Sequence, residues 1–530
     1  MSSLPNDIDE RDEQLAAVSV DVADFFERII GSYNDGTAEA ELPADTGVAR
    51  SFVPAGTGAM RDFSYITPEI PEFIQENCVG CMDCVTQCPD TAILGKVVEE
   101  GVLEERLASV ADAETRQHLK EQFAVTTKYH AKAQKEGKAP GMFGIFIDPT
   151  KCKGCAECVE ACGDHAALKM VTKTPPLLQR YASDFSFFKA LPATPPEYIN
   201  EKVLADMMLA ERSLLYVGGA GSCMGCGEAT VLRMMLAATG FVHGQNSMGI
   251  VAATGCNTVY GSTYPYNPYL VCWTNSLFEN APTDAMGVRA RWNQMGWRDK
   301  KLWVLGGDGA MLDIGFQALS RMLASGMNIN VLILDTQVYS NTGGQASTST
   351  FLGQETKMSM HGKVLQGKTE RRKEIGLIAM MHADVLVAQT TAAHTNHFYR
   401  AIMAANEYEG PAVINCYTTC QPEHGVADDM AMHQAKLAAD SRAFPIFLYD
   451  PRKGEKMSER LSLQGNPAQR EDWYKNPKTG EVMDFIYWAR TEGRFAKHFN
   501  GNGEPTETLL KGQADRLAYW HLLQELAGIR

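Results

Sequence analysis

Eight of the fourteen cysteines in this sequence follow one pattern that occurs twice, and the pattern is one that binds iron. The segments CVGCMDCVTQC and CKGCAECVEAC both have the spacing C-x2-C-x2-C-x3-C, with which thiolates hold [4Fe-4S] clusters. The first segment contributes Cys78, Cys81, Cys84 and Cys88, and the second contributes Cys152, Cys155, Cys158 and Cys162.

The fourth cysteine of each such segment binds the cluster of the other segment. We therefore expect one cluster on Cys78, Cys81, Cys84 and Cys162, and a second on Cys152, Cys155, Cys158 and Cys88. Zinc knuckles and reactive thiols are the alternatives. Zinc takes four ligands that usually come as two separated pairs, so two complete copies of this pattern favour clusters. Gly80 and Gly154 would let backbone N–H groups approach the sulfurs.

A second group of residues has the types that bind a diphosphate through a metal ion. The stretch GDGAMLDIGFQALSRMLASGMNINVLILDTQVYSNTGG reads as a strand end, a helix and a second strand, and it resembles the GDG…N motif of thiamine-diphosphate enzymes. Mg2+ needs oxygen ligands in octahedral geometry, which the Asp308 carboxylate, Thr336 and the Val338 carbonyl can supply. Gly307 and Gly309 would let the backbone approach the phosphates at a helix N-terminus.

The GDG triplet alone also fits an ordinary strand-to-helix turn, and the second strand that ends in DT…NTGG favours the cofactor site instead. The nearby stretch GGAGSCMGCGE does not have the G-x-G-x-x-G register of a dinucleotide-binding loop. It does contain the pair Cys223 and Cys226, and Cys256 follows in ATGCN. Such a pair is typical of a redox dithiol or half a zinc site, and with remote cysteines it can also hold a third [4Fe-4S] cluster. Three cysteines compete for the fourth position: Cys272, Cys416 and Cys420.

Short apolar runs such as KLWVLGG and NINVLILDT read as buried parallel strands that alternate with helical stretches. This predicts an α/β fold with a doubly wound thiamine-diphosphate-binding domain, preceded by a small α+β ferredoxin-like domain with two clusters. The domain boundaries that we predict are 1–60 for an N-terminal arm or connector, 61–175 for the ferredoxin-like domain with a helical insertion at about 100–140, 176–200 for a Pro-rich linker, 201–430 for the thiamine domain and 431–530 for a C-terminal extension.

The composition is that of an ordinary globular protein of 530 residues with a net charge of −15, which argues against a nucleic-acid-binding surface. No apolar run of about 18 residues predicts a membrane span. The N-terminal segment MSSLPNDIDERDEQ lacks the basic and apolar regions of a secretory signal, so we expect a cytoplasmic protein. In a reducing compartment, closely spaced cysteines bind metal or do redox chemistry rather than form disulfides.

Several segments together resemble the C-terminal half of the pyruvate:ferredoxin oxidoreductase family over roughly residues 60–450: CMGCGE, ATGCNTVYGSTYPYNPY, WTNSLFENA, GGDGAMLDIG and DTQVYSNTGGQ. The resemblance implies that the cluster beside the thiamine is held by Cys223, Cys226, Cys256 and Cys420, with Cys272 and Cys416 as buried structural cysteines. It also implies that Glu228 faces the cofactor and that Asn341 faces the substrate end of the thiazolium ring.

The resemblance further implies oxidative decarboxylation of a 2-oxoacid, most simply pyruvate, to acyl-CoA and CO2, or the reverse carboxylation. The cofactors would be thiamine diphosphate, Mg2+ and three [4Fe-4S] clusters, with CoA as co-substrate and an external ferredoxin or flavodoxin as electron partner. Family members commonly carry further domains that supply a glutamate to activate the thiamine and an arginine to bind the substrate carboxylate. We find no such region in this sequence and expect a second subunit to bring it, in a higher oligomer.

Three other functions compete with this one. A 2-oxoglutarate:ferredoxin oxidoreductase subunit would use the same residues on a different substrate. An electron-transfer subunit with a vestigial thiamine fold would not need the set Asp308, Thr336 and Asn341, which is intact. A non-redox thiamine decarboxylase would not need cysteines close to the cofactor.

Overall fold

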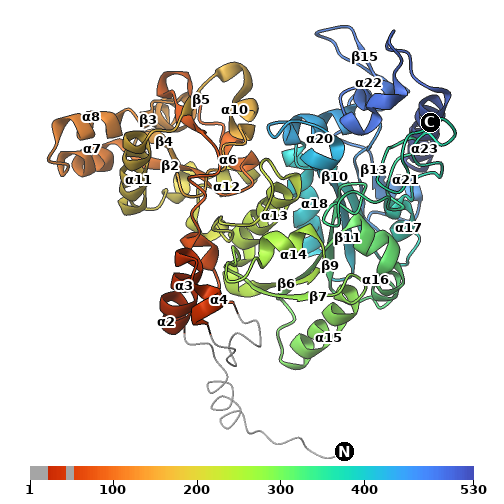
Figure 1. The fold of residues 1–530 in the computed structure, drawn as a ribbon, viewed down its shortest axis with the longest axis horizontal. Helices are drawn as coiled ribbons and strands as arrows, with labels where there is room; N and C mark the ends of the chain where they lie inside the picture. The colour runs from red at the N-terminus through yellow and green to blue at the C-terminus, as the bar shows by residue number, and fades with distance from the viewer. Residues whose placement is uncertain (1–21, 43–52) are drawn as a thin grey trace, which may run out of the picture.

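An eight-stranded sheet forms the centre of the larger of two lobes in the computed structural model, which describes residues 22–42 and 53–530 (Figure 1). The spatial order of the strands is β13-β12-β10-β11-β9-β8-β6-β7. Their bounds are Met248–Ala253 for β6, Cys272–Ser276 for β7, Lys301–Gly307 for β8, Asn330–Asp335 for β9, Leu386–Thr391 for β10, Ala412–Tyr417 for β11, Phe447–Tyr449 for β12 and Leu461–Ser462 for β13. Strands β6 to β11 are parallel to one another, and β12 and β13 run antiparallel at one edge.

Helices cover both faces of this sheet, because alternate residues of its strands point to opposite sides. In β8, Trp303 and Leu305 pack with α13 (Gly227–His243) and α18 (Thr395–Glu407) on one face. Leu302 and Val304 pack on the other face with a second set of helices. These are α15 (Ala281–Gln294), α16 (Phe316–Leu323), α17 (Ile375–Met380) and α23 (Glu507–Leu526). The prediction of a doubly wound α/β fold is confirmed.

The smaller lobe contains both ferredoxin-like cysteine segments and lies beside the larger lobe in Figure 1. A two-stranded antiparallel sheet joins β1 (Glu69–Phe73) and β5 (Leu168–Thr172). A second sheet has the order β2-β4-β3, with bounds Ile93–Glu99, Gly141–Ile147 and Phe123–Ala124 respectively. Each cysteine segment ends in a short helix, α6 (Asp83–Gln87) or α10 (Glu157–Cys162). The antiparallel strands and short helices give this lobe its α+β character.

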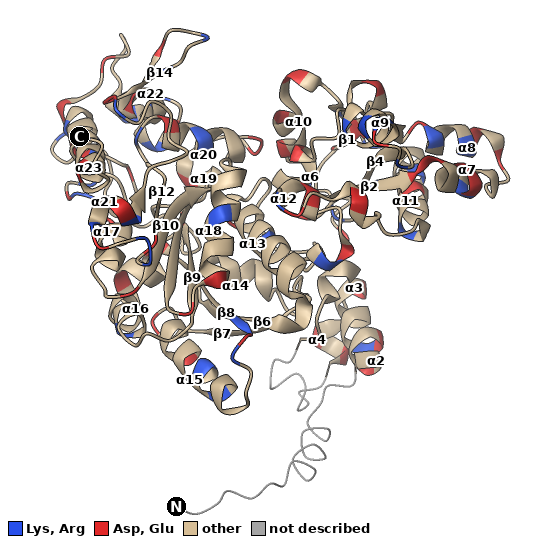
Figure 2. Ribbon diagram, turned by 180° about the vertical axis from the view of Figure 1, so that it is seen from behind, with Lys and Arg blue, Asp and Glu red and all other residues tan. Residues whose placement is uncertain are grey.

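The segment predicted as a helical insertion contains α7 (Glu100–Ala108), α8 (Ala113–Lys120), η4 (Thr127–Ala131) and α9 (Lys132–Lys135), together with the short strand β3. Helices α7 and α8 extend away from the rest of the lobe and carry charged residues of both signs, whereas the central strands of the large sheet carry almost none (Figure 2). Helices α7 and α8 therefore present a charged outer surface, whereas β3 and η4 contribute Phe123 and Tyr129 to the core of the lobe.

Two predicted segments differ from the structure. The predicted Pro-rich linker at 176–200 is mostly helical, because α11 spans Pro175–Ala190. Thr174 caps this helix by accepting a hydrogen bond from the N–H of Leu177, and proline is well tolerated in the first helical turn. The sheet also continues beyond residue 430, where we placed the end of the thiamine domain, since β12, β13 and α23 all belong to that domain's layers. An apolar sheet edge and face need cover, and the C-terminal segment provides it.

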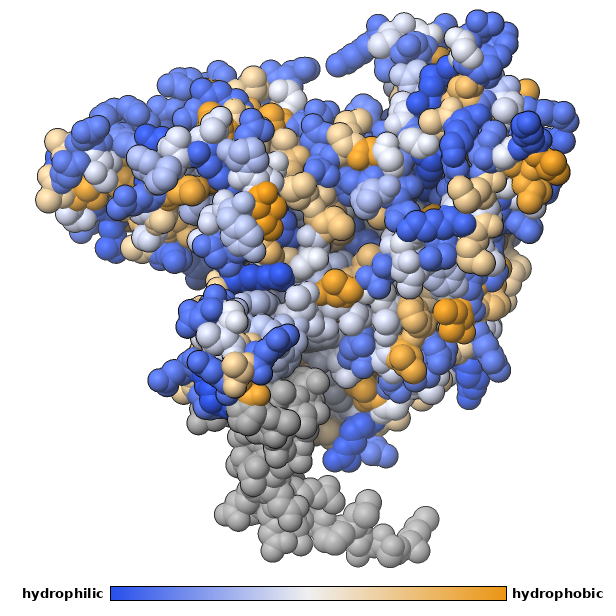
Figure 3. Space-filling model, viewed as in Figure 1, coloured by the Kyte–Doolittle hydropathy of each residue, from blue (hydrophilic) through white to orange (hydrophobic). Residues whose placement is uncertain are grey.

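The predicted N-terminal arm at 1–60 lies partly outside the described residues. The described part contains α2 (Val22–Asp24), η1 (Phe25–Ile30), α3 (Gly31–Asp35) and α4 (Ala38–Glu41). Phe25, Ile29 and Ile30 pack against Tyr266 of the larger lobe. Within the described ranges, no helix has the length and apolar character that crossing a membrane requires. The face seen in Figure 3 is mainly hydrophilic, with separate hydrophobic groups rather than one broad patch.

Buried charged side chains join the two lobes. Arg233, on α13 of the larger lobe, donates hydrogen bonds through Nη1 to the carbonyls of Val85 (2.5 Å), Thr86 (3.3 Å) and Cys88 (3.0 Å) in the smaller lobe. In the opposite direction, Lys153 of the smaller lobe pairs with Asp90 (2.7 Å) and donates to the carbonyls of Ala220 (2.9 Å) and Ser222 (2.8 Å). Both contacts fix the backbone within a few residues of cysteines.

We predict that Arg233→Met loosens the junction between the lobes. The substitution keeps an apolar stem but leaves buried carbonyls without a charged donor, which should cost about 2 kcal/mol. Thermal unfolding and limited proteolysis of the anaerobically purified protein would measure the effect. Arg298→Met is the matched control, because Arg298 is exposed. If the two variants unfolded and were cleaved alike, Arg233 would not stabilise the junction between the lobes.

Candidate functional site

The eight ferredoxin-like cysteines surround two cavities of similar size, with about 350 and 370 Å3 of empty space. The first cavity is lined by Cys78, Cys81, Cys84 and Cys162. The second is lined by Cys152, Cys155, Cys158 and Cys88. Each cavity thus combines three cysteines from one segment with the last cysteine of the other, which is the grouping expected from the spacing. Among the described residues, no three His, Cys, Asp or Glu side chains converge at the spacing of a single metal ion. The thiols instead surround a space.

The two cysteine loops have the same backbone turns, which explains why their cavities match. Gly80 and Gly154 have left-handed φ angles of 74° and 69°, and Met82 and Ala156, just before the helices, have 71° and 64°. A Cβ on Gly154 would meet the Glu69 carbonyl oxygen at 2.8 Å, so this position requires glycine. The N–H of Gly80 favours the thiolate of Cys78, and that of Gly154 favours the thiolate of Cys152.

Burial opposes ionisation of these thiols. It raises the pKa of Cys84 and of Cys158 well above the usual value, with neighbouring cysteines adding to the shift. Thiolates are the form that binds iron, so a positively charged centre in each cavity would offset the cost of burying them. The donor set of four cysteines around each cavity fits a [4Fe-4S] cluster.

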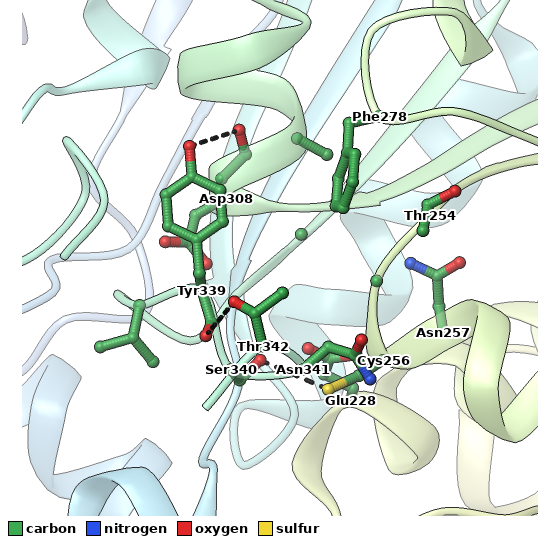
Figure 4. A pocket seen from close by; sticks show the side chains of 15 residues that line it. Glu228, Thr254, Cys256, Asn257, Phe278, Asp308, Tyr339, Ser340, Asn341 and Thr342 are labelled. Carbon is green, nitrogen blue, oxygen red and sulfur yellow. Dashed lines mark hydrogen bonds between the residues drawn. The ribbon is translucent and has the colours of Figure 1, made fainter. Parts of the chain in front are cut away.

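A third cavity, of about 360 Å3, lies at the carboxyl ends of the strands of the large sheet (Figure 4). It is lined by Glu228, Thr254, Gly255, Cys256, Asn257, Phe278, Gly307, Asp308, Gly309, Ala310, Val338, Tyr339, Ser340, Asn341 and Thr342. Six of the seven residues predicted to contact thiamine diphosphate are among them, and the seventh, Thr336, is bonded to Asp308. We call this cavity the thiamine pocket.

Three oxygens converge beside the thiamine pocket where β8 and β9 end. The Asp308 carboxylate accepts hydrogen bonds from the Thr336 N–H and hydroxyl, both at 3.2 Å, and that hydroxyl lies 3.1 Å from the Val338 carbonyl. Neighbouring ligands of an octahedral Mg2+ ion are about 2.9 Å apart, as bond lengths near 2.1 Å require. The predicted set Asp308, Thr336 and Val338 therefore fits one face of a magnesium site.

Burial raises the pKa of Asp308 well above the usual range, and the neighbouring Asp335 carboxylate raises it further. A hydrogen bond from the Ser347 hydroxyl (2.5 Å) opposes this shift. A divalent cation would offset the same cost.

Close packing explains the glycine at position 309, because a Cβ there would overlap the ring of Tyr339.

The third group of cysteines lies against the thiamine pocket. Cys256 lines the pocket and its sulfur is 3.4 Å from the Ser340 hydroxyl (Figure 4). Burial raises the pKa of Cys256, and the nearby Glu228, Cys420 and Cys223 groups add to the shift. Burial likewise raises the pKa of Cys226 well above its usual value, with Glu228, Cys256 and Cys223 adding to it. The four cysteines that the resemblance implied are thus close enough to raise one another's pKa.

Glu228 is the common neighbour of these cysteines and of the pocket. Its carboxylate accepts a hydrogen bond from the Tyr260 hydroxyl at 3.4 Å. Burial raises the pKa of Glu228 to about 8, and the bond from Tyr260 opposes that shift. Asn341, by contrast, is exposed at the rim of the pocket. The two predicted catalytic residues therefore line the same pocket, one buried and one open to solvent.

Of the three cysteines that competed for the fourth position, Cys420 belongs with this group, whereas Cys416 and Cys272 do not. Cys416 is fully buried in β11, where its thiol donates to the Tyr417 carbonyl, and the charged group that affects its pKa is Asp335. Burial raises the pKa of Cys420 to about 12, with Glu228 and Cys223 contributing. Cys272 does not fit the expectation of a buried structural cysteine, because it is exposed on β7. The reason is topological, since β7 is the last strand at its edge of the sheet.

Several residues of this site were not predicted from the sequence. Ser340 and Ser347 lie in the segment that follows β9 and bond Cys256 and Asp308. Thr254, Asn257 and Phe278 line the pocket from the turn after β6, from α14 (Cys256–Gly261) and from the segment after β7. The hydroxyl-rich run STST after NTGGQ is the signal that could have indicated Ser347.

Known proteins resemble this chain as follows. The family model described as thiamine pyrophosphate enzyme, C-terminal TPP binding domain, matches residues 253–416. The chain is 28% identical to the probable pyruvate-flavodoxin oxidoreductase of Escherichia coli (strain K12), over 76% of this chain and 38% of that protein. It is 27% identical to the pyruvate:ferredoxin oxidoreductase of Moorella thermoacetica, over 87% of this chain and 42% of that protein. It therefore spans about two fifths of the length of these relatives.

A solved 2-oxoglutarate:ferredoxin oxidoreductase from Magnetococcus marinus is 21% identical, with a TM-score of 0.34, over 38% of this chain and 65% of that chain.

We predict that Asp308→Asn abolishes binding of Mg2+ and thiamine diphosphate but leaves the iron content unchanged. The amide retains the shape but removes the negative charge that a hard cation requires. Calorimetric titration with the cofactor and iron analysis of the same sample would measure both. Asp299→Asn is the control, because Asp299 is exposed and lies outside the pocket lining. Normal cofactor affinity in Asp308→Asn would disprove the metal assignment.

We predict that Cys420→Ala lowers the iron content from about 12 to about 8 atoms per chain, whereas Cys416→Ala leaves it unchanged. Cys420 lies among the cysteines beside the thiamine pocket, and Cys416 does not. Iron analysis and EPR of the two variants would decide between them. Loss of iron in the Cys416 variant with a full complement in the Cys420 variant would reverse the assignment.

Proposed function

This chain is related to the C-terminal part of the pyruvate:ferredoxin and pyruvate-flavodoxin oxidoreductases, and from that premise we propose that it is the thiamine- and cluster-bearing subunit of a CoA-dependent 2-oxoacid oxidoreductase. The names of the relatives favour pyruvate as the substrate. The observation that carries the proposal is the position of Cys256. This cysteine forms part of the thiamine pocket and also belongs to a group of four cysteines. The thiamine diphosphate and the cluster that accepts its electrons would therefore both lie next to Cys256.

Thiamine diphosphate, when bound, supplies a carbon nucleophile for the keto group and accepts the electron pair that loss of CO2 releases. The chain's own residues would bind and orient it. Asp308, Thr336 and the Val338 carbonyl would hold Mg2+ and through it the diphosphate. The ring of Phe278 forms an apolar wall of the pocket, and Asn341 at the exposed rim is placed to meet an incoming substrate.

The cysteine groups would carry electrons away from the pocket in a fixed order. Cys223 follows Ser222, whose hydroxyl and carbonyl both accept hydrogen bonds from Lys153, at 2.9 and 2.8 Å. Lys153 lies within the second ferredoxin-like segment and lines the cavity of Cys88, Cys152, Cys155 and Cys158. We infer that this cluster accepts electrons from the one beside the thiamine. The cluster of Cys78, Cys81, Cys84 and Cys162 would then pass them to an external ferredoxin or flavodoxin.

The matched region is less than half the length of these relatives. We propose a second subunit that brings the groups activating the thiamine and binding the substrate carboxylate, within a higher oligomer in the cytoplasm. A 2-oxoglutarate-specific enzyme is the competing proposal, because the carboxylate-binding groups would lie outside this chain. The pocket residues described here would serve either substrate.

We predict that pyruvate with CoA reduces the clusters of the complex purified through this chain, as followed by EPR, whereas this chain alone shows no oxoacid-dependent reduction of viologen. 2-Oxoglutarate is the matched alternative substrate. Reduction by 2-oxoglutarate but not pyruvate would move the enzyme to the competing proposal. Turnover by the purified single chain, loaded with cofactors, would disprove the need for a second subunit, and no reduction by any 2-oxoacid would disprove the oxidoreductase.

A further inference from the structure

The C-terminal segment reaches the metal-binding loop through one buried arginine. Arg494, in η10 (Gly493–His498), is 4% exposed and donates through Nη1 to the side-chain oxygen of Gln337 at 3.0 Å. Gln337 is the residue between Thr336 and Val338, two of the three predicted magnesium ligands. Arg494 and Gln337 are 157 positions apart in the sequence, so neither the GDG motif nor its spacing indicates this contact.

Gln337 has a backbone conformation that needs support. Its φ angle is 59°, in the left-handed region that residues other than glycine rarely adopt. Such conformations are strained and persist where surrounding contacts hold them. The amide nitrogen of Gln337 donates to both the carbonyl and the carboxylate of Asp335, and Arg494 fixes the other end of the same amide. The side chain is therefore held at both ends.

The position of Arg494 is itself fixed. Its Nε donates to the Glu492 carboxylate at 2.5 Å, and both side chains of this pair are almost fully buried. Glu492 also accepts a hydrogen bond from the Tyr417 hydroxyl at 3.0 Å. The backbone carbonyl of Arg494 accepts from the N–H of Glu355 at 3.0 Å. A buried cation paired with a carboxylate and bonded on several sides has little freedom to move.

We propose that Arg494, oriented by Glu492, is a positioning residue for the magnesium–diphosphate site. It holds Gln337 in the left-handed conformation, and this turn directs the Thr336 hydroxyl and the Val338 carbonyl toward Asp308. The inference rests on the proposed thiamine function and assigns a role to the C-terminal segment within it. Partners that orient metal ligands typically contribute about 10–100-fold to metal affinity.

Another buried arginine of the same segment provides a matched control. Arg442 is fully buried and donates to the carbonyls of Pro467 (2.6 Å) and Ala468 (3.0 Å), with its guanidinium over the Trp520 ring. None of these partners belongs to the thiamine pocket. Arg442→Met therefore removes a buried cation of the C-terminal segment without touching the metal-binding loop.

The test measures the affinity of the complete complex for Mg2+ and thiamine diphosphate by calorimetry after removal of the cofactor. Four variants are compared with the unmodified protein: Arg494→Met, Arg442→Met, Gln337→Gly and the double variant Arg494→Met/Gln337→Gly. We expect Arg494→Met to weaken Mg2+-dependent binding by about 10–100-fold and Arg442→Met to leave it unchanged. Iron content, measured on each sample, should stay constant.

The double variant separates positioning from a general loss of structure. Glycine adopts the left-handed conformation without a Cβ penalty, so Arg494→Met should have little further effect once Gln337→Gly is present. Equal losses in the Arg494 and Arg442 variants, or the same loss from Arg494→Met in both backgrounds, would overturn the inference, as would normal affinity in Arg494→Met. Failure of the unmodified complex to bind thiamine diphosphate would instead overturn the proposed function.

Discussion

The buried Asp308 carboxylate is the constraint on which the larger lobe depends. A carboxylate in this position is costly, because it lies out of contact with water and near a second carboxylate, that of Asp335. The surrounding structure supplies polar groups to offset the cost. Ser347 donates a hydrogen bond to Asp308. Asp335 forms a buried ion pair with Arg372 and accepts a hydrogen bond from Ser349 at 2.6 Å. A divalent cation bound in the thiamine pocket would neutralise the Asp308 carboxylate further.

The same principle explains why the segment after β9 is rich in hydroxyl groups and basic residues. Lys368 is buried and donates to the carbonyls of Ser347, Thr348 and Thr350, at 2.9, 3.2 and 2.9 Å. Burial lowers the pKa of Lys368 to about 8, and the positive charge of Arg372 adds to that shift. One lysine thus fixes three backbone carbonyls of a segment that has no regular secondary structure. A helix or strand could not bring Ser347 back to Asp308, so side-chain hydrogen bonds replace backbone ladders here.

Features that lie within a short stretch of sequence could be predicted, whereas contacts between residues far apart in the sequence could not. The ferredoxin-like pattern and the strand-to-helix turn at Asp308 each lie within a short stretch, so their geometry follows from spacing, and the doubly wound fold follows from alternating apolar runs. Helix α11 was missed because its prolines were interpreted as a linker, although they occupy the first helical turn and Thr174 caps it. Strand β12 was missed because it is 3 residues long. Arg494 could not be found at all, because a contact with Gln337 leaves no trace in local pattern or composition.

The junction between the lobes would couple folding to the binding of clusters. Arg233 donates to the Cys88 carbonyl, and Lys153 lies between two cysteines of the second ferredoxin-like segment while bonding the backbone next to Cys223. The side chains that join the lobes are thus attached to the loops that would bind clusters. Loops that present several buried thiols are poorly stabilised by apolar packing alone, and metal binding contributes directly to their folding. A lobe whose clusters were missing would therefore also lose the backbone positions that Arg233 and Lys153 need. If clusters fill these cysteine groups, the contacts of Arg233 and Lys153 would set both the placement of the two lobes and the path between the clusters.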